Sequence, residues 1–182
     1  VSEDGKTTIA TQLAKAAAAM QQRLLLVDAD LRKPNLQELN MHDSRDGLTD
    51  VITDRLNLMD VVRPMPDETN LYVLLSGLLP LDPTSLLGSQ KMQMLMESCQ
   101  SNFDLIIYDT APLNFADSLL LVPQTDGLLL VARLGDIHRE TLQNAVRLLD
   151  TSQVPVLGLV VNMVNDHQFS AGASYPQQIK NY

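Results

Sequence analysis

The chain has 182 residues, a length that fits one domain with a substantial core. Its 45% hydrophobic and 19% charged residues are ordinary for a globular protein. The net charge of −9 excludes an overall basic surface of the kind that binds nucleic acid or anionic membranes. A binding site for phosphates must therefore draw its positive charge from helix N-termini and a few Lys or Arg side chains.

Cysteine content and hydropathy narrow the class of protein further. Cys99 is the only cysteine, which excludes an intramolecular disulfide, and its apolar helical surroundings predict a buried structural thiol. No apolar run approaches the roughly 18 residues that cross a membrane, and no signal peptide opens the chain. We therefore expect a cytosolic domain.

Five short apolar runs predict strands. They are continuous rather than alternating, which is typical of a parallel sheet covered on both faces. The runs are 24–28, 71–75, 105–109, 127–132 and 156–162. Helical patterns occupy 7–20, 48–53, 89–100, 116–122 and 137–151, and loops are predicted at 63–66 and 77–83. This alternation predicts an α/β fold, with a predominantly parallel sheet and helices on both faces in three α/β/α layers.

The two ends of the chain depart from this pattern. Val1 is not an initiator Met, and the motif in which the chain begins normally follows a strand, so we expect a fragment whose first strand lies upstream. We predict a single domain over residues 1–166. The polar composition of residues 167–182 predicts a flexible tail.

Residues 1–7, V-S-E-D-G-K-T, match the phosphate-binding pattern G-x-x-x-x-G-K-[ST] from its second position onward, and its first Gly would precede Val1. Gly5 lets the backbone approach phosphates closely, Lys6 places a charge on the β- and γ-phosphates, and the Thr7 hydroxyl suits Mg²⁺. The predicted nucleotide-binding residues of this loop are Ser2, Glu3, Asp4, Gly5, Lys6, Thr7 and Thr8. By itself, the motif is also compatible with a Gly-Lys turn that caps an ordinary helix.

Acidic residues lie at the ends of two predicted strands. Asp28 and Asp30 lie at the carboxyl end of the first, and Asp109 ends another apolar run, as in a Walker B motif. Ligands of open α/β sheets bind at this edge, and carboxylates rarely cluster without a cation. We therefore predict a Mg²⁺ site made by Thr7, Asp30 and Asp109. The alternative for the first pair is a solvated acidic turn, neutralised by the two basic residues that follow it.

These elements together resemble the MinD/ParA-like branch of P-loop proteins and, more narrowly, the bacterial tyrosine kinases of capsular and exopolysaccharide synthesis. The segment V-D-A-D-L-R-K-P at 27–34 is similar to the Walker A′ segment of those kinases. Further matches in order are 47–51, 75–77, 83–89, 108–112, 117–119 and 158–162. The resemblance covers most of residues 2–166.

The resemblance implies a role for each matching residue. Lys6, Asp28 and Asp30 would be catalytic, with Asp28 as the general base that accepts the tyrosine hydroxyl proton. Asn162 would read the adenine of ATP and Arg133 would flank the nucleotide. A turn residue remains the alternative for Asn162, and an ordinary surface residue the alternative for Arg133.

The resemblance also implies an activity and partners. The chain would be an ATP- and Mg²⁺-dependent protein-tyrosine kinase domain that regulates polysaccharide synthesis or export. We expect a homo-oligomer that uses ATP, binds no nucleic acid, and lies at the inner face of the plasma membrane through a fused or partner chain-length regulator. The family's tyrosine-rich tail is reduced here to Tyr175 and Tyr182, the two candidate phosphoacceptors. A MinD/ParA-type ATPase switch and a degenerate nucleotide-binding scaffold of the export complex remain alternatives.

Overall fold

A computed structural model of the chain describes residues 4–39, 45–113, 115–134, 139–152 and 155–164. The predictions for Ser2, Glu3, Tyr175, Tyr182 and the tail at 167–182 lie outside these residues. Of the helices described, none is both long and apolar enough to cross a membrane.

The described strands form two sheets. Their bounds are β1 (Leu24–Ala29), β2 (Arg63–Pro64), β3 (Leu71–Leu74), β4 (Leu105–Thr110), β5 (Leu128–Arg133) and β6 (Val156–Asn162). The first sheet has the order β2–β3–β1–β4, and the second pairs β5 with β6. All pairs are parallel except β2 with β3. The predicted predominantly parallel α/β fold is therefore confirmed, and all five predicted strands are present.

The helices separate these strands along the chain. The α-helices are α1 (Lys6–Ala19), α2 (Leu48–Ile52), α3 (Leu58–Val61), α4 (Pro83–Leu87), α5 (Gln90–Gln100), α6 (Asp117–Leu121) and α7 (Arg139–Ser152), and the two 3₁₀-helices are η1 (Leu36–Leu39) and η2 (Val122–Gln124). Side-chain caps begin two of them: Asp82 accepts from the Ser85 amide, and Ser89 accepts from the Met92 amide. These caps explain why α4 begins directly after Asp82 and α5 directly after Ser89.

Two features of the sheets differ from the expectation. The prediction of a loop at 63–66 is wrong for Arg63 and Pro64, which form β2 at the edge of the first sheet. An edge position tolerates Pro64 because its missing N–H leaves no ladder bond unmade. Within the described residues, β4 pairs only with β1 and β5 only with β6, so the strands form two sheets rather than one.

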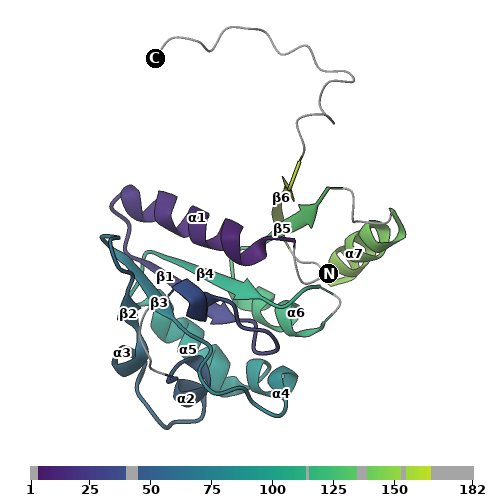
Figure 1. Cartoon of the computed structure of the whole chain (residues 1–182). Helices are drawn as coiled ribbons and strands as arrows, with labels where there is room; N and C mark the ends of the chain where they lie inside the picture. Colours follow the sequence, from purple (N-terminus) through teal and green to yellow (C-terminus); the bar gives the residue numbers. More distant parts are fainter. Residues whose placement is uncertain (1–3, 40–44, 114, 135–138, 153–154, 165–182) are drawn as a thin grey trace, which may run out of the picture.

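Helix α1 covers one face of the first sheet (Figure 1). It is rich in alanine, and the buried side of the helix presents Ala14, Ala17 and Ala18 to the sheet. Small side chains let a helix lie close to the strands, here against Leu24 and Leu26 of β1. This close packing places the N-terminus of α1 near the carboxyl ends of β1 and β4.

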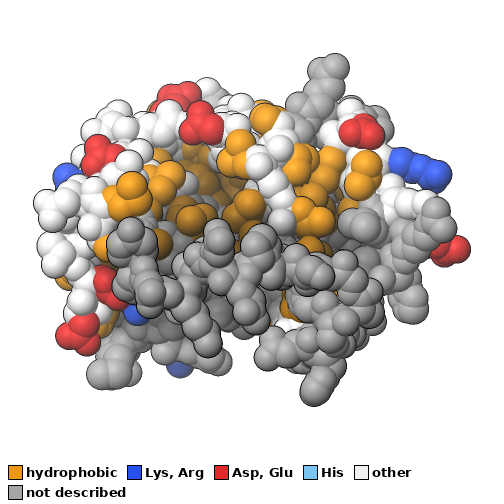
Figure 2. All heavy atoms as spheres, turned by 90° about the horizontal axis from the view of Figure 1, so that it is seen from above, with side chains coloured by type: hydrophobic (Ala, Val, Ile, Leu, Met, Phe, Trp, Pro, Cys, Tyr) orange, Lys and Arg blue, Asp and Glu red, His pale blue; other side chains and the backbone are white. Residues whose placement is uncertain are grey.

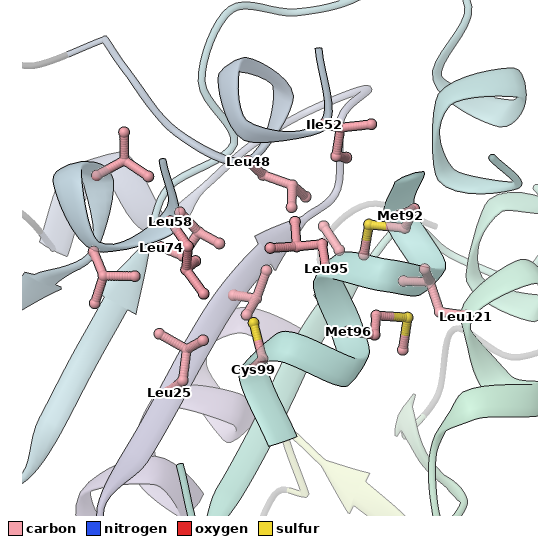
Figure 3. Close-up of a cluster of buried hydrophobic side chains, with 14 of the residues drawn as sticks. Leu25, Leu48, Ile52, Leu58, Leu74, Met92, Leu95, Met96, Cys99 and Leu121 are labelled. Atoms are coloured by element: carbon pink, nitrogen blue, oxygen red, sulfur yellow. The ribbon is translucent and has the colours of Figure 1, made fainter. Parts of the chain in front are cut away.

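Helices α2 and α5 cover the opposite face, so the first sheet lies between two helical layers (Figure 1). Figure 3 shows Met92, Met96 and Cys99 of α5 directed into a cluster with Leu25 of β1 and Leu74 of β3. The predicted buried thiol is confirmed, because Cys99 is 1% exposed and takes part in this core.

The second sheet is less covered than the first. Leu157, Leu159 and Val161 of β6 are all exposed, as is Leu129 of β5. Seen from above, hydrophobic side chains gather across the middle of the molecule (Figure 2). The expectation of a further strand upstream of Val1 stays a prediction.

Replacing Gly47 with Ala should destabilise the fold. A Cβ at Gly47 would lie 2.2 Å from the Leu75 carbonyl oxygen and 2.5 Å from the Gly77 nitrogen, both backbone atoms that cannot rotate away. We expect the free energy of unfolding to fall by about 1–3 kcal/mol in urea denaturation. Gly158→Ala is the matched control, because its Cβ would meet only the Leu129 side chain at 3.6 Å. Equal stabilities for the two variants would contradict this account.

Cys99 should react with thiol reagents only after the protein unfolds. Burial raises the pKa of its thiol to about 12, so the reactive thiolate is scarce at neutral pH as well as inaccessible. Since it is the only cysteine, labelling with a chromogenic disulfide reagent reports on this core alone. We expect labelling to follow the denaturant unfolding curve, and rapid labelling of the native protein would show that the α5 face opens locally.

Candidate functional site

The N-terminus of α1 and the carboxyl ends of β1 and β4 form one site. Gly5 precedes the helix in the left-handed region, with φ 84° and ψ 24°, a conformation that favours glycine. Lys6 and Thr7 then form the first turn of α1. The Thr7 hydroxyl donates a hydrogen bond of 2.6 Å to the Asp109 carboxylate. The phosphate-loop stub and the Walker B-like aspartate, 102 residues apart, therefore lie in direct contact.

Asp28 lies beside Asp109 because the two residues are partners in the parallel register of β1 and β4. Asp28 is 0% exposed, and one of its carboxylate oxygens, Oδ2, accepts a 3.1 Å hydrogen bond from the Leu36 amide. The other, Oδ1, is buried and has no hydrogen-bond partner among the described residues. Burial, together with the neighbouring carboxylates of Asp109 and Asp30, raises the pKa of Asp28 to about 7, although the Leu36 hydrogen bond opposes this shift.

Asp109 is also buried, but a hydrogen bond and a nearby positive charge partly offset the effect of burial on its pKa. Burial raises its pKa, whereas the Thr7 hydrogen bond and the charge of Lys6 oppose that shift. Lys6 thus provides positive charge next to the carboxylates, at the point where the α1 dipole also favours anions.

Asp30 has a different local role. Its Oδ1 accepts the backbone N–H groups of Arg32 at 3.1 Å and of Lys33 at 2.9 Å, which stabilises the turn after β1. Asp28 and Asp30 are both buried, so the alternative of a solvated acidic turn is wrong. Asp30 nevertheless acts on the electrostatics of the site, because its charge raises the pKa values of both Asp28 and Asp109.

The donor set fits Mg²⁺. In the described part of the chain, no three acidic, His or Cys side chains are placed to hold a metal ion by themselves. Mg²⁺ rarely needs such a cage, since it binds one or two carboxylates together with phosphate oxygens and water. The oxygens of Thr7 and Asp109, with the unpartnered Oδ1 of Asp28 beside them, are ligands of the type that Mg²⁺ prefers.

Asn162 joins the phosphate loop to β6. Its side-chain amide donates a 3.0 Å hydrogen bond to the Asp4 carbonyl oxygen, and its own oxygen accepts the Met163 amide at 2.9 Å. Arg133 lies beside it, since the two are register partners at the carboxyl ends of β5 and β6. Asn162 therefore lies at the loop with Arg133 next to it on β5, and the nucleotide-binding roles of both stay predictions.

The remaining described residues of the loop differ in exposure. Asp4 is half-buried, and its Oδ1 is a buried atom without a partner among the described residues. Thr8, by contrast, is exposed on α1.

An ion pair beside the site was not predicted from the sequence. Arg32 pairs with Asp117, and this contact joins the segment after β1 to α6. The hydrogen bond from Arg32 lowers the pKa of Asp117 despite the burial of the carboxyl group. The two residues are 85 positions apart, so sequence spacing could not connect them. The only available signals were the Arg-Lys pair after Asp30 and the family match at 117–119.

Comparison with known proteins agrees with this geometry. The sequence profile of the CobQ/CobB/MinD/ParA nucleotide binding domain matches residues 2–177. The tyrosine-protein kinase YwqD of Bacillus subtilis is 34% identical over 160 residues, which cover 87% of this chain and 67% of YwqD. The putative tyrosine-protein kinase EpsB of Ralstonia solanacearum is 30% identical over 174 residues, which cover 94% of this chain but 23% of EpsB.

A solved structure extends the comparison to three dimensions. The kinase domain of the Escherichia coli tyrosine kinase ETK superposes with a TM-score of 0.82 at 27% identity, covering 99% of this chain and 68% of that one. The chain therefore belongs to the CobQ/CobB/MinD/ParA family of nucleotide-binding domains, in the branch that contains the bacterial tyrosine kinases.

Proposed function

We propose that this chain is an ATP-dependent protein-tyrosine kinase domain that regulates polysaccharide synthesis or export. The observation that carries the proposal is the contact of Thr7 with Asp109, next to the unpartnered carboxylate oxygen of Asp28. This arrangement supports a site in which the N-terminus of α1 would bind phosphate, the edge of the sheet would bind the metal, and Asp28 would act as the base.

Phosphate binding would come from the N-terminus of α1. Gly5 allows close approach, the backbone N–H groups of the first turn face the anion, and Lys6 supplies a point charge. Thr7, Asp109 and Asp30 would hold Mg²⁺, the last partly through water. The ion would neutralise charge on the phosphate oxygens.

Asp28 is the proposed general base. The tyrosine hydroxyl oxygen attacks the γ-phosphorus of ATP, its proton passes to the Asp28 carboxylate, and the bond to the β,γ-bridging oxygen breaks to release ADP. A base with a pKa near 7 suits proton transfer at neutral pH. Because Asp28 is fully buried and holds a hydrogen bond from the Leu36 amide, residues around it must move when tyrosine binds.

The acceptor tyrosines and the partners belong to the same proposal. The chain has four tyrosines, of which Tyr72 and Tyr108 pack against the core. We therefore propose Tyr175 and Tyr182 as phosphoacceptors, presented to a neighbouring copy in a homo-oligomer. The domain would act at the inner face of the plasma membrane, with a chain-length regulator that is fused to it or separate.

Lys6→Met should abolish phosphate binding without unfolding the protein. We expect ATP affinity and phosphotyrosine formation to fall by about 100-fold or more, because the main cation at the phosphates is lost. Lys15→Met is the matched control on the same helix, where Lys15 pairs with Glu68 at 3.0 Å. Labelled ATP and mass spectrometry would measure the product and map it to Tyr175 or Tyr182. Unchanged phosphotyrosine in Lys6→Met would refute the proposal.

Asp28→Asn should separate ATP binding from chemistry. The change keeps the size of the side chain and removes the base, so phosphotyrosine should fall by about 10²–10⁴-fold while ATP still binds. Asp104→Asn is the control at the amino end of β4, where the carboxylate accepts the Arg23 amide at 2.8 Å, away from the predicted site. If the wild-type protein releases phosphate without forming phosphotyrosine, water is the acceptor and the chain is a MinD/ParA-type ATPase. Nucleotide binding without turnover would identify a scaffold instead.

A further inference from the structure

A second polar contact lies beside the site and joins three segments of the chain. Arg32, after β1, donates from Nε and Nη2 to the two carboxylate oxygens of Asp117 in α6, with Nη2 3.2 Å from Oδ1. Nη2 is also 3.1 Å from the Thr84 hydroxyl of α4, and that hydroxyl donates to Asp117 Oδ1 at 2.6 Å. We call this group of three residues, Arg32, Thr84 and Asp117, the Arg32 clamp.

The clamp requires the shape of an arginine. Its planar guanidinium bonds both oxygens of one carboxylate and lies 4.4 Å from the centroid of the Phe115 ring. A lysine ammonium carries the same charge but cannot reproduce the two parallel bonds or the stacking on the ring. The partner carboxylate is 1% exposed, so water cannot replace a lost bond easily.

The clamp connects directly to the site through the backbone. The same residue that reaches Asp117 with its side chain donates its backbone N–H to Asp30 Oδ1 at 3.1 Å. Arg32 is thus held at both ends, by Asp30 on the β1 side and by α6 on the β4 side. Movement of its guanidinium would disturb the turn that orients the Asp30 carboxylate.

We propose that Arg32 is a positioning residue for Asp30, and that the Arg32 clamp couples the turn after β1 to the segment after β4 so that Mg²⁺ and nucleotide bind together. This inference rests on the proposed function, in which Asp30 supports the metal. Arg32 itself touches neither nucleotide nor metal in this scheme. Its loss therefore weakens Mg²⁺ binding rather than phosphate binding as such.

The chain offers a matched control in a second arginine on a buried aspartate. Arg55 Nη1 lies 3.3 Å from Asp50 Oδ1, and Asp50 is 3% exposed. This pair belongs to α2 and the turn after it, on the face of the sheet opposite α1. Arg55→Lys therefore tests the cost of weakening a similar ion pair away from the metal site.

The experiment compares Arg32→Lys and Arg55→Lys in the purified protein. ATP binding is titrated with Mg²⁺ and repeated in EDTA, and the melting temperature is measured in parallel. We expect Arg32→Lys to raise the Mg²⁺ concentration at half-saturation by about 10-fold, as the loss of an outer-shell partner does at other metal sites, with ATP binding in EDTA unchanged. Arg55→Lys should leave the Mg²⁺ midpoint unchanged.

Asp117→Asn provides a second route to the same result. It should shift the Mg²⁺ midpoint like Arg32→Lys, and the double variant should show no further shift because both changes break one contact. Thr84→Val replaces the hydroxyl with a methyl group and so breaks only the Thr84 contacts of the clamp. It should shift the Mg²⁺ midpoint in the same direction, and it tests the inference if the other variants do not fold.

Two results would overturn the inference. A lowered melting temperature in the Arg32 clamp variants with an unchanged Mg²⁺ midpoint would make the clamp a purely structural contact. ATP binding by the wild-type protein that does not depend on Mg²⁺ at all would refute the metal site of the proposed function, and this inference with it.

Discussion

The in-register parallel pairing of β1 with β4 is the constraint on which the site depends. It places Asp28 next to Asp109, and a shift by one residue would turn one of them to the opposite face. The apolar side chains of the two strands, buried on β1 and half-buried on β4, pack into the hydrophobic clusters on both faces of the sheet and favour that register. The hydrophobic core thus determines the geometry of the polar site at its edge.

The charge of the site explains why it fits a cationic ligand. Asp28 and Asp109 are buried side by side, and one oxygen of Asp28 has no partner among the described residues. Burial and neighbouring carboxylates raise both pKa values, with Asp109 and Asp30 acting on Asp28 and Asp30 acting on Asp109, so holding these carboxylates charged together carries an electrostatic strain. In a protein of net charge −9, binding of Mg²⁺ together with a nucleotide would relieve this strain.

Several contacts hold the parts of the site in place from outside. The alanine-lined face of α1 sets the helix close to the sheet, so that Thr7 reaches Asp109. Asn162 ties the loop to the end of β6, and the Arg32 clamp ties the turn after β1 to α4 and α6. The site is therefore assembled from both sheets and from helices far apart in the sequence. The geometry of its side chains thus depends on the stability of the whole domain.

The amino-acid sequence by itself determined the α/β class, all five long strands and the three acidic strand ends. It could do so because continuous apolar runs mark buried parallel strands, and because such strands end at a common edge. The tertiary structure alone decided that Arg63 and Pro64 pair at the sheet edge, that Asn162 bonds the phosphate loop, and that Arg32 meets Asp117. These contacts join residues that are separated in the sequence and meet only because of strand order and side-chain packing. Strand order and packing leave no periodic signal along the chain.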